Sequence, residues 1–265
     1  MDWRRPGSPL NENRATAPQR VGVPAYSYPR TNKAYWSQLV AGAPTVALIV
    51  ADPADGPGNG RDPNYVAAIK QARQRGIAVV GYVTLRYGAA AGAPLGAAIE
   101  AWYDLYTVDG IFVDEVPSSR LCVDECHQVY SWVKRQTSGL GLVVLNPGTQ
   151  TVEDYMATCD ILVNSESTWV TYRDAYPQPP TWVENYPANR FWHLVHACPT
   201  ESEMRTAVWL ARARNAGWIF VTHHTGVNAY DRLPGEEYWL SELRRAMVTT
   251  DPRLPRADDP PHSGR

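Results

Sequence analysis

Short apolar runs rich in Val and Ile alternate along the chain with longer segments of helical periodicity. Eight such runs predict strands at residues 21–28, 45–52, 77–84, 109–115, 142–148, 161–166, 190–197 and 218–224. Their nearly continuous apolar character, as in "TVALIVAD", indicates strands covered on both faces, which is typical of a parallel sheet. Eight strand and helix pairs in succession predict an α/β protein with a single-domain (β/α)8 TIM barrel.

The helical segments between these runs carry recognisable ends. "DPNYVAAIKQARQRG" has Asp62 as N-cap, Pro63 at the first helical position and Gly76 as the terminating residue. "TESEMRTAVWLARARNAG" repeats the scheme, with Thr200 as the cap and Gly217 at the end. Three further segments are amphipathic, at 95–106, 122–136 and 236–248. A doubly wound open sheet is the competing fold, but "AYSYPR" after the first strand is not a Gly-rich phosphate loop.

The two ends of the chain differ from its middle. Residues 1–19 and 251–265 are rich in Pro, Asp and Arg, so we expect flexible extensions on either side of a barrel domain at 20–250. The N-terminal segment has no apolar core of a secretory signal, which leaves open a protein that stays inside the cell and one whose leader is lost. No stretch approaches the roughly 18 unbroken apolar residues of a membrane span.

Composition narrows the classes of partner. The 25 Lys and Arg against 27 Asp and Glu give a formal charge of −2 without a long basic run, so nucleic acid is not expected as a partner. The 10 Trp and 15 Tyr against 3 Phe favour a wet aromatic surface of the kind that stacks on sugar rings. The four cysteines lack zinc-type spacing and fit buried thiols, with one disulfide left open. We expect a monomer that needs no cofactor.

Polar residues collect at the carboxyl ends of the predicted strands, where the loops of a barrel assemble its functional site. They are Tyr26, Tyr28, Asp52, Tyr82, Thr84, Asp114, Glu115, Asn146, Glu166, His193, His196, His223 and His224. The strand beginnings hold far fewer, chiefly Asp109 and Arg190. The carboxyl edge of the barrel is therefore the predicted site.

Three carboxylates at this edge suggest catalysis, because a buried carboxylate is costly unless it is paired or faces a wet cleft. The strands that carry Asp114 and Glu166 are two apart, which places the two groups about 5 to 9 Å from one another. That range fits the acid pair of a glycoside hydrolase and leaves retention and inversion open. Alternation sends Asp114 and Glu115 to opposite sides, so one faces the barrel axis while the other reaches the site from the rim or orients its neighbour. In the alternative interpretation, the acids cap helices or pair with Arg86 and Arg120.

Five stretches in order resemble one family: "VPAYSYP", "DGPGNGRDPNY", "GYVTLRYG", "DGIFVDE" and "LNPGT". They make the chain similar to the spherulin-4 family, the spherulation-specific proteins related to glycoside hydrolase family 135, over residues 21–170. The resemblance implies a (β/α)8 barrel and endo-acting hydrolysis of α-1,4-linked N-acetylgalactosamine or galactosamine polymers, with essential acids matching Asp114, Glu115 and Glu166. It also implies an extracellular or membrane-tethered protein. Asp52 and Pro53 stand where relatives tend to have Asn-Pro, which bears on the substrate more than on the fold.

Three hypotheses of function follow. In the first, the protein is a glycosidase acting on an amino-sugar polymer, with Asp114 and Glu166 as acid/base and nucleophile in unassigned order and Glu115 as a supporting or alternative acid. Its predicted substrate contacts are Tyr26, Tyr28, Asp52, Tyr82, Asn146, His196 and His223. In the second, a carbohydrate-binding or spore-coat type protein keeps the cleft without turnover. In the third, a metal-dependent hydrolase uses the strand-end histidines with Asp114, although HxH and HExxH spacings are absent and no metal ligand is assigned.

Overall fold

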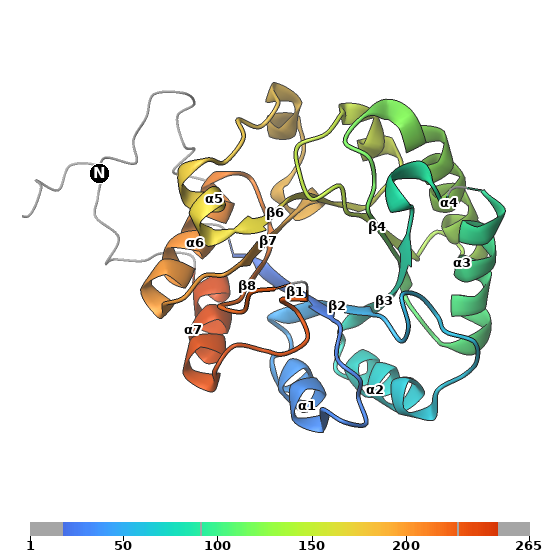
Figure 1. The fold of residues 1–265 in the computed structure, drawn as a ribbon, viewed down its shortest axis with the longest axis horizontal. Coiled ribbons are helices and arrows are strands. Elements are labelled where there is room, and N and C mark those ends of the chain that lie inside the picture. Colours follow the sequence, from blue (N-terminus) through green and yellow to red (C-terminus); the bar gives the residue numbers. More distant parts are fainter. Residues whose placement is uncertain (1–17, 91, 227, 249–265) are drawn as a thin grey trace, which may run out of the picture.

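The computed structural model describes residues 18–90, 92–226 and 228–248, which form a closed barrel of eight parallel strands (Figure 1). Each strand pairs with its neighbour in the sequence, and β8 closes the barrel on β1. This confirms the predicted (β/α)8 fold. The strands are β1 (Arg20–Ala25), β2 (Val46–Ala51), β3 (Ala78–Thr84), β4 (Gly110–Asp114), β5 (Leu142–Leu145), β6 (Ile161–Thr168), β7 (Phe191–His196) and β8 (Trp218–Val221).

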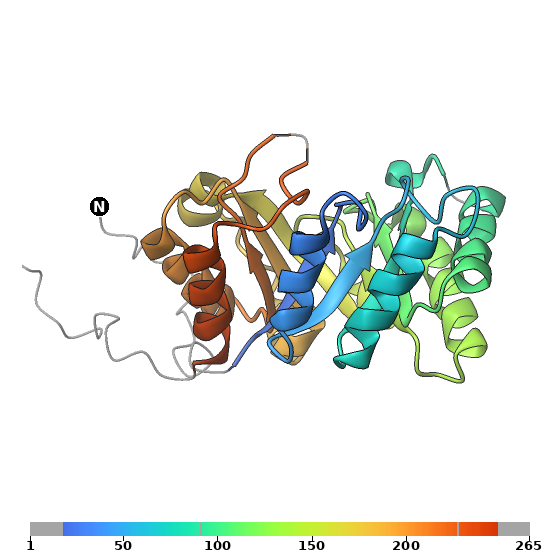
Figure 2. The ribbon, with the colours of Figure 1, turned by 90° about the horizontal axis from the view of Figure 1, so that it is seen from below.

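Helices surround the barrel on its outer side (Figures 1 and 2). They are α1 (Lys33–Ala41), α2 (Pro63–Gln74), α3 (Ala93–Leu105), α4 (Val123–Gln136), α5 (Trp169–Asp174), α6 (Glu201–Ala213) and α7 (Glu236–Met247). Short 3-10 helices lie in the connections: η2 (Arg86–Gly88), η3 (Arg120–Cys122), η4 (Glu153–Ala157), η5 (Thr181–Asn185) and η6 (Ala188–Arg190). Between β5 and β6, η4 stands in place of a longer helix.

The strands are packed on both faces, as their apolar runs predicted. On the outer face, a Cβ at Gly81 would lie 2.3 Å from the Trp102 ring, so only glycine lets this part of α3 approach β3 so closely. The Trp102 indole also donates to the Tyr82 carbonyl at 2.7 Å. Inside the barrel, the Phe112 ring stacks on Tyr82 and meets Trp192 edge-on, each at a centroid distance of 6.1 Å. Aromatic rings therefore fill the interior below the mouth.

The helix ends test the sequence signals residue by residue. Asp62 and Thr200 cap α2 and α6 through their side-chain oxygens, and Gly76 follows α2 with a φ of 78°, as predicted. The predicted role of Gly217 is wrong, because α6 ends at Ala213 and Asn215 takes the left-handed conformation, with a φ of 64°. Gly217 is instead needed for a close approach of two backbones: its Cβ would lie 2.8 Å from the carbonyl carbon of Ala188.

The packed domain begins earlier than the sequence indicated. Gln19, assigned above to the N-terminal extension, is buried. Its backbone N–H donates to the Ala246 carbonyl at 2.8 Å, and its side-chain amide donates to the Ala216 carbonyl at 2.8 Å. Gln19 therefore joins the start of β1 to the end of α7. The rest of the predicted extensions, at 1–17 and 251–265, lies outside the described residues.

The cysteines settle whether a disulfide forms in the described structure. The four cysteines are buried free thiols: Cys122, Cys126, Cys159 and Cys198. The disulfide that the sequence analysis left open as a possibility therefore does not form. Burial also raises the pKa of the Cys159 thiol to about 12, which keeps it protonated and unreactive.

Among the helices of the described residues, none combines the length and the apolar character needed to cross a bilayer.

Candidate active site

Asp114, the last residue of β4, stands half-buried at the mouth of the barrel. Its two carboxylate oxygens accept hydrogen bonds from the Tyr82 hydroxyl at 2.9 Å and from the Asn146 amide at 2.8 Å. The register of β3 and β4 pairs Tyr82 with Phe112 and Thr84 with Asp114. Since alternate residues of a strand point to the same side, Asp114 faces inward above the aromatic rings.

Asn146, in the turn after β5, joins the two principal carboxylates. Its Nδ2 donates to Asp114 Oδ1 and to Glu166 Oε2, both at 2.8 Å. Two bonds that meet at one nitrogen hold these oxygens no more than 5.6 Å apart, twice 2.8 Å, and the splay of the amide protons sets about 4.8 Å. The same turn wraps Glu166, whose N–H donates to the Gly148 carbonyl at 2.8 Å.

Glu166 lies on β6, beyond an irregularity of the strand. The register between β6 and β7 shifts between Val163 and Ser165, so Asn164 is an extra residue that moves the following side chains to the opposite face. The second oxygen of Glu166 accepts from the Tyr230 hydroxyl at 2.8 Å. Glu166 is therefore held by two neutral donors from opposite sides, Asn146 and Tyr230.

Tyr230 is a site residue that the sequence analysis missed. It lies in the connection between β8 and α7, which rises above the barrel in Figure 2, and its side chain is buried. The Tyr26 ring meets the rings of Tyr230 and Tyr82 edge-on, at 6.1 Å and 5.7 Å. Three tyrosines thus line the mouth beside the acids. The signal was an aromatic residue in a loop at the functional edge, but a long loop has no periodicity that fixes where a side chain points.

The electrostatics of the site come from burial and from the closeness of the two acids. Burial raises the pKa of Asp114 to about 6, and the negative charge of Glu166 adds to the rise. Hydrogen bonds from the Glu115 backbone, from Tyr82 and from Asn146 act in the opposite direction. Within the described residues, no Lys or Arg forms an ion pair with Asp114 or Glu166. Burial also raises the pKa of Tyr230, so its hydroxyl stays protonated and donates.

Glu115 diverges from its neighbour. Its φ of 51° turns the chain at the end of β4, and its carboxylate accepts from the Thr84 hydroxyl at 2.7 Å. Asp114 therefore faces the barrel axis, whereas Glu115 lies at the rim. Neither arginine of the alternative interpretation binds these acids in the described structure, since Arg120 pairs with Asp154 at 2.7 Å and Arg86 forms no ion pair.

Two other predicted substrate contacts, Asp52 and Tyr28, differ in how they relate to the carboxylate network. Asp52 lies beside the network, because the charge of Asp114 contributes to its pKa, which burial raises to about 6. Its carboxylate accepts from the Gly56 N–H at 2.8 Å, which orders the loop after β2. Tyr28 is 36% exposed and accepts from the Asn64 amide at 3.0 Å, outside the carboxylate network.

Within the described residues, the strand-end histidines form no hydrogen bond with the acids. His196 ends β7 half-buried, and its Nδ1 has no hydrogen-bond partner among the described residues. His223 contacts the rings of His224 and Tyr238, at 4.1 Å and 5.7 Å. His193 is fully buried and bonds the Tyr172 hydroxyl at 2.6 Å, so it belongs to the packing of β7. Across 18–90, 92–226 and 228–248, no group of three or more His, Cys, Asp or Glu could hold a metal ion.

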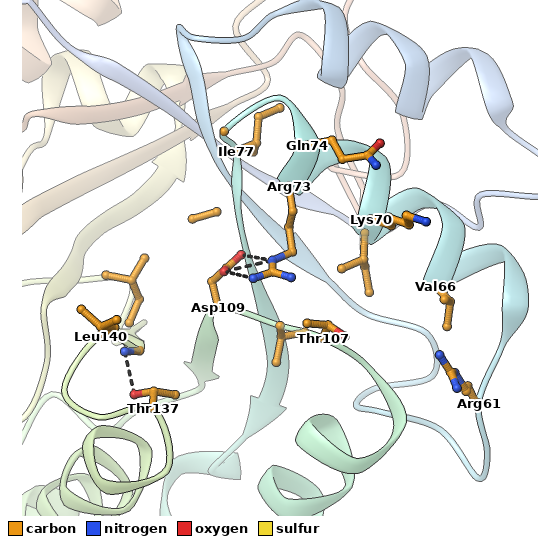
Figure 3. A pocket seen from close by; sticks show the side chains of 16 residues that line it. Arg61, Val66, Lys70, Arg73, Gln74, Ile77, Thr107, Asp109, Thr137 and Leu140 are labelled. Carbon is orange, nitrogen blue, oxygen red and sulfur yellow. Dashed lines mark hydrogen bonds and ion pairs between the residues drawn. The ribbon is translucent and has the colours of Figure 1, made fainter.

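A groove also lies at the opposite end of the barrel (Figure 3). It is lined by α2 and by the starts of β3 and β5, and Asp109 lies in it. Asp109 accepts from the Arg73 guanidinium at 3.0 Å and from the Val79 N–H at 2.9 Å, which ties α2 to β3. None of the predicted site residues lines this groove. The candidate site is therefore the mouth at the carboxyl ends of the strands.

Solved structures of other proteins resemble this barrel, and two of them illustrate the likeness. The crystal structure of Aspergillus clavatus Sph3 in complex with GalNAc is 26% identical, with a TM-score of 0.72, and the match covers 87% of this chain and 98% of that one. A chitinase from Chromobacterium violaceum matches with a TM-score of 0.57 at 14% identity, over 86% of this chain and 98% of that one. The second likeness shows the fold alone.

The sequence itself matches one family. Spherulin-4 of Physarum polycephalum is 31% identical over 178 residues, which are 66% of this chain and 52% of the relative. The chain thus spans about half the length of this curated relative. The model of the spherulation-specific family 4, Spherulin4, matches residues 20–245, which include all eight strands. The chain therefore belongs to the spherulation-specific family 4, as its sequence motifs indicated.

Proposed function

We propose that this protein is a glycoside hydrolase that cleaves an amino-sugar polysaccharide, of the endo-α-1,4-galactosaminidase or N-acetylgalactosaminidase type. One observation carries the proposal: the single amide of Asn146 holds the carboxylates of Asp114 and Glu166 within 5.6 Å at the mouth of the barrel. Paired carboxylates at this spacing are the machinery of glycosidic bond cleavage. The GalNAc complex of Sph3, at 26% identity, supports the class of sugar.

The spacing of the acids favours retention of configuration. Retaining glycosidases hold their carboxyl groups about 5 to 5.5 Å apart, whereas inverting enzymes need about 6.5 to 9.5 Å to admit a water. The oxygens of Asp114 and Glu166 that accept from Asn146 lie no more than 5.6 Å apart, which matches the shorter spacing. This geometry fits an acid that attacks the sugar directly. It lies at the short end of the separation of about 5 to 9 Å between the two carboxylates that the sequence predicted.

The pKa of Asp114 assigns the roles in the first step. With a pKa of about 6, Asp114 retains its proton in mildly acidic solution and donates it to the leaving glycosidic oxygen. Glu166, oriented by Asn146 and Tyr230, attacks the anomeric carbon as that bond breaks. The products are a shortened chain with a new hydroxyl and a sugar covalently bound to Glu166.

The second step reverses these roles. Asp114, now deprotonated, removes a proton from a water molecule, and the oxygen of that water attacks the anomeric carbon. The bond to Glu166 breaks, the carboxylate is restored and Asp114 is protonated again. Tyr26 and Tyr82 present ring edges and hydroxyls beside the acids, where they would contact the sugar. Glu115 supports the rim through Thr84.

Hydrolysis of defined polymers tests this proposal. The protein is incubated with α-1,4-linked galactosamine and N-acetylgalactosamine polymers, the products are identified by mass spectrometry and the first anomer formed is identified by NMR. We expect internal cleavage with the α-anomer released first, and no product from the folded Glu166→Gln variant. Release of the β-anomer would contradict the retaining mechanism. Polymer binding without any product would instead support the carbohydrate-binding alternative.

A further inference from the structure

Two large apolar side chains are exposed in the connections that follow β3 and β4, the strand that ends at Asp114. Tyr87, in the connection between β3 and α3, is 64% exposed, and Leu121, in the connection between β4 and α4, is 70% exposed. The two connections touch, since a Cβ at Gly88 would lie 3.3 Å from the Leu121 side chain. Exposed apolar groups that gather beside a polar site are typical of a surface for binding a ligand.

The backbone that presents Tyr87 is held in an uncommon conformation. Arg86, Tyr87 and Glu115 all have positive φ, at 45°, 53° and 51°, which L-residues with side chains rarely adopt. Hydrogen bonds fix this conformation: the Tyr87 N–H donates to the Glu115 carbonyl at 2.8 Å, and the Leu85 N–H donates to the Asp114 carbonyl at 2.9 Å. Strained backbone that its surroundings enforce is concentrated at functional sites.

The side chain of Glu115 completes this support. The Thr84 hydroxyl donates to the Glu115 carboxylate at 2.7 Å and accepts from the Arg86 N–H at 3.0 Å. Thr84 thus links the carboxylate of one strained residue to the backbone of another. The turn after β3 is therefore fastened to the end of β4, and the position of the Tyr87 ring depends on Glu115.

The Tyr87 hydroxyl lies within electrostatic reach of the acids at the mouth. Partial burial and then the negative charges of Glu115, Asp114 and Glu166 raise its pKa. Glu166 lies on β6, three strands away from β3 around the barrel. The charges of acids on both β4 and β6 therefore reach the Tyr87 hydroxyl. Tyr87 is thus exposed to solvent and close to the acids at the same time.

From this geometry we infer that Tyr87 and Leu121 form an additional sugar-binding subsite, which takes a ring of the polymer next to the ring that is cleaved. This inference rests on the proposed function. The ring of Tyr87 would stack on the apolar C–H face of a sugar, and Leu121 would extend the apolar surface. Glu115 acts here as a positioning residue, because it holds the turn that presents Tyr87.

Binding and kinetics across oligosaccharides of increasing length test this subsite. Tyr87→Gly removes the ring and suits the left-handed backbone, so it should fold as well as the parent. We expect the KM for long oligosaccharides to rise about tenfold with little change in kcat, while the shortest cleavable substrate is unaffected. Tyr87→Trp should restore the KM, and Leu140→Ala, an exposed apolar residue in the groove of Figure 3, should leave it unchanged.

The positioning role of Glu115 has its own measurement. Glu115→Ala should raise the KM for long substrates as Tyr87→Gly does. The variant with both changes should have a KM no higher than either single variant, because both changes remove the same sugar-binding surface. Glu115→Gln keeps an oxygen that accepts from Thr84 and should rescue the KM. A loss of kcat in Glu115→Ala on every substrate, without a change in KM, would make Glu115 catalytic and overturn this part of the inference.

The failure of the subsite differs from the failure of the proposed function. If the parent protein cleaves the polymer and Tyr87→Gly has the same KM at every length, the subsite is wrong while the hydrolase stands. If the parent yields no product, calorimetric titration of the polymer into Asp114→Asn, with and without Tyr87→Gly, still measures the subsite. The subsite is supported if Asp114→Asn with Tyr87→Gly binds the polymer about tenfold more weakly than Asp114→Asn alone. Equal binding by the two proteins would overturn the subsite.

Discussion

The two ends of the barrel treat their carboxylates in opposite ways. At the strand beginnings, Asp109 and Asp160 each accept from a backbone N–H of a neighbouring strand and from a basic residue of a preceding helix, Arg73 or Lys134. At the strand ends, the side chains that donate to Asp114 and Glu166 in the described part of the chain are neutral: Tyr82, Asn146 and Tyr230.

The difference separates structural acids from candidate catalytic acids. A cation beside a carboxylate neutralises its charge and fixes a helix to the sheet, but leaves little charge for a substrate. Neutral donors orient a carboxylate while its charge and its proton remain available, and the burial of Asp114 raises its pKa to about 6. The predictions below test whether this division between the two ends is real.

The largest effect is expected on activity when the two ends are compared directly. Asp114→Asn should lower kcat/KM about 1,000-fold, because the amide has no proton to give to the leaving oxygen. Asp109→Asn, at the opposite end, should change kcat/KM less than about twofold on the same substrate. Steady-state kinetics with thermal melts of both variants provide the measurement. Equal losses of activity in Asp114→Asn and Asp109→Asn would show that the acids at the two ends of the barrel do not differ in role.

Asn146→Ala tests the shared amide, with an expected loss of about 100-fold in kcat/KM. Without this donor, both acids lose an orienting bond, and their mutual repulsion is no longer offset. Gln150→Ala serves as the control, because its amide bonds the Asn164 carbonyl and the Tyr176 hydroxyl rather than an acid. Wild-type kinetics in Asn146→Ala would show that the acids do not depend on the amide.

At the strand beginnings we expect a loss of stability instead. Asp160→Ala removes the acceptor for the Val143 N–H and the partner of Lys134. This change should lower the free energy of unfolding by about 1 to 3 kcal/mol. Urea denaturation gives this value, and Asp160→Asn, which keeps an acceptor for the N–H, should lose less. The activity of the folded protein should stay close to that of the parent. A stability unchanged from the parent would show that this ion pair is dispensable.

The smallest expected effect is a pH-dependent difference in melting temperature. The pKa of Asp114 rises from 3.8 to about 6 on folding, so the folded state binds its proton more tightly than the unfolded state does. Its contribution to stability is complete below pH 3.8 and is lost as the pH rises through 6. Asp114→Asn should therefore gain several degrees in melting temperature over the parent between acidic and neutral pH in calorimetry. A constant difference would contradict the raised pKa.

Much of this molecule could be predicted from its sequence. The strands follow from short, nearly continuous apolar runs, and the caps Asp62 and Thr200 follow from side chains that bond within one turn. The placement of Asp114, Asn146 and Glu166 at one edge follows from parallel strand order alone. These features are local, or depend only on the order of elements, and a linear sequence records both.

Only the tertiary structure decided which of these residues meet. The irregularity at Asn164 sets the face on which Glu166 lies, the positive φ of Glu115 separates it from Asp114, and the Tyr230 hydroxyl reaches Glu166 from a connection 64 residues away. Each depends on packing between segments that are distant in sequence, and none leaves a periodic signal. The sequence thus determined the barrel and the edge that carries the acids, whereas their spacing arose from barrel closure, because closure fixes distances that no local interaction specifies.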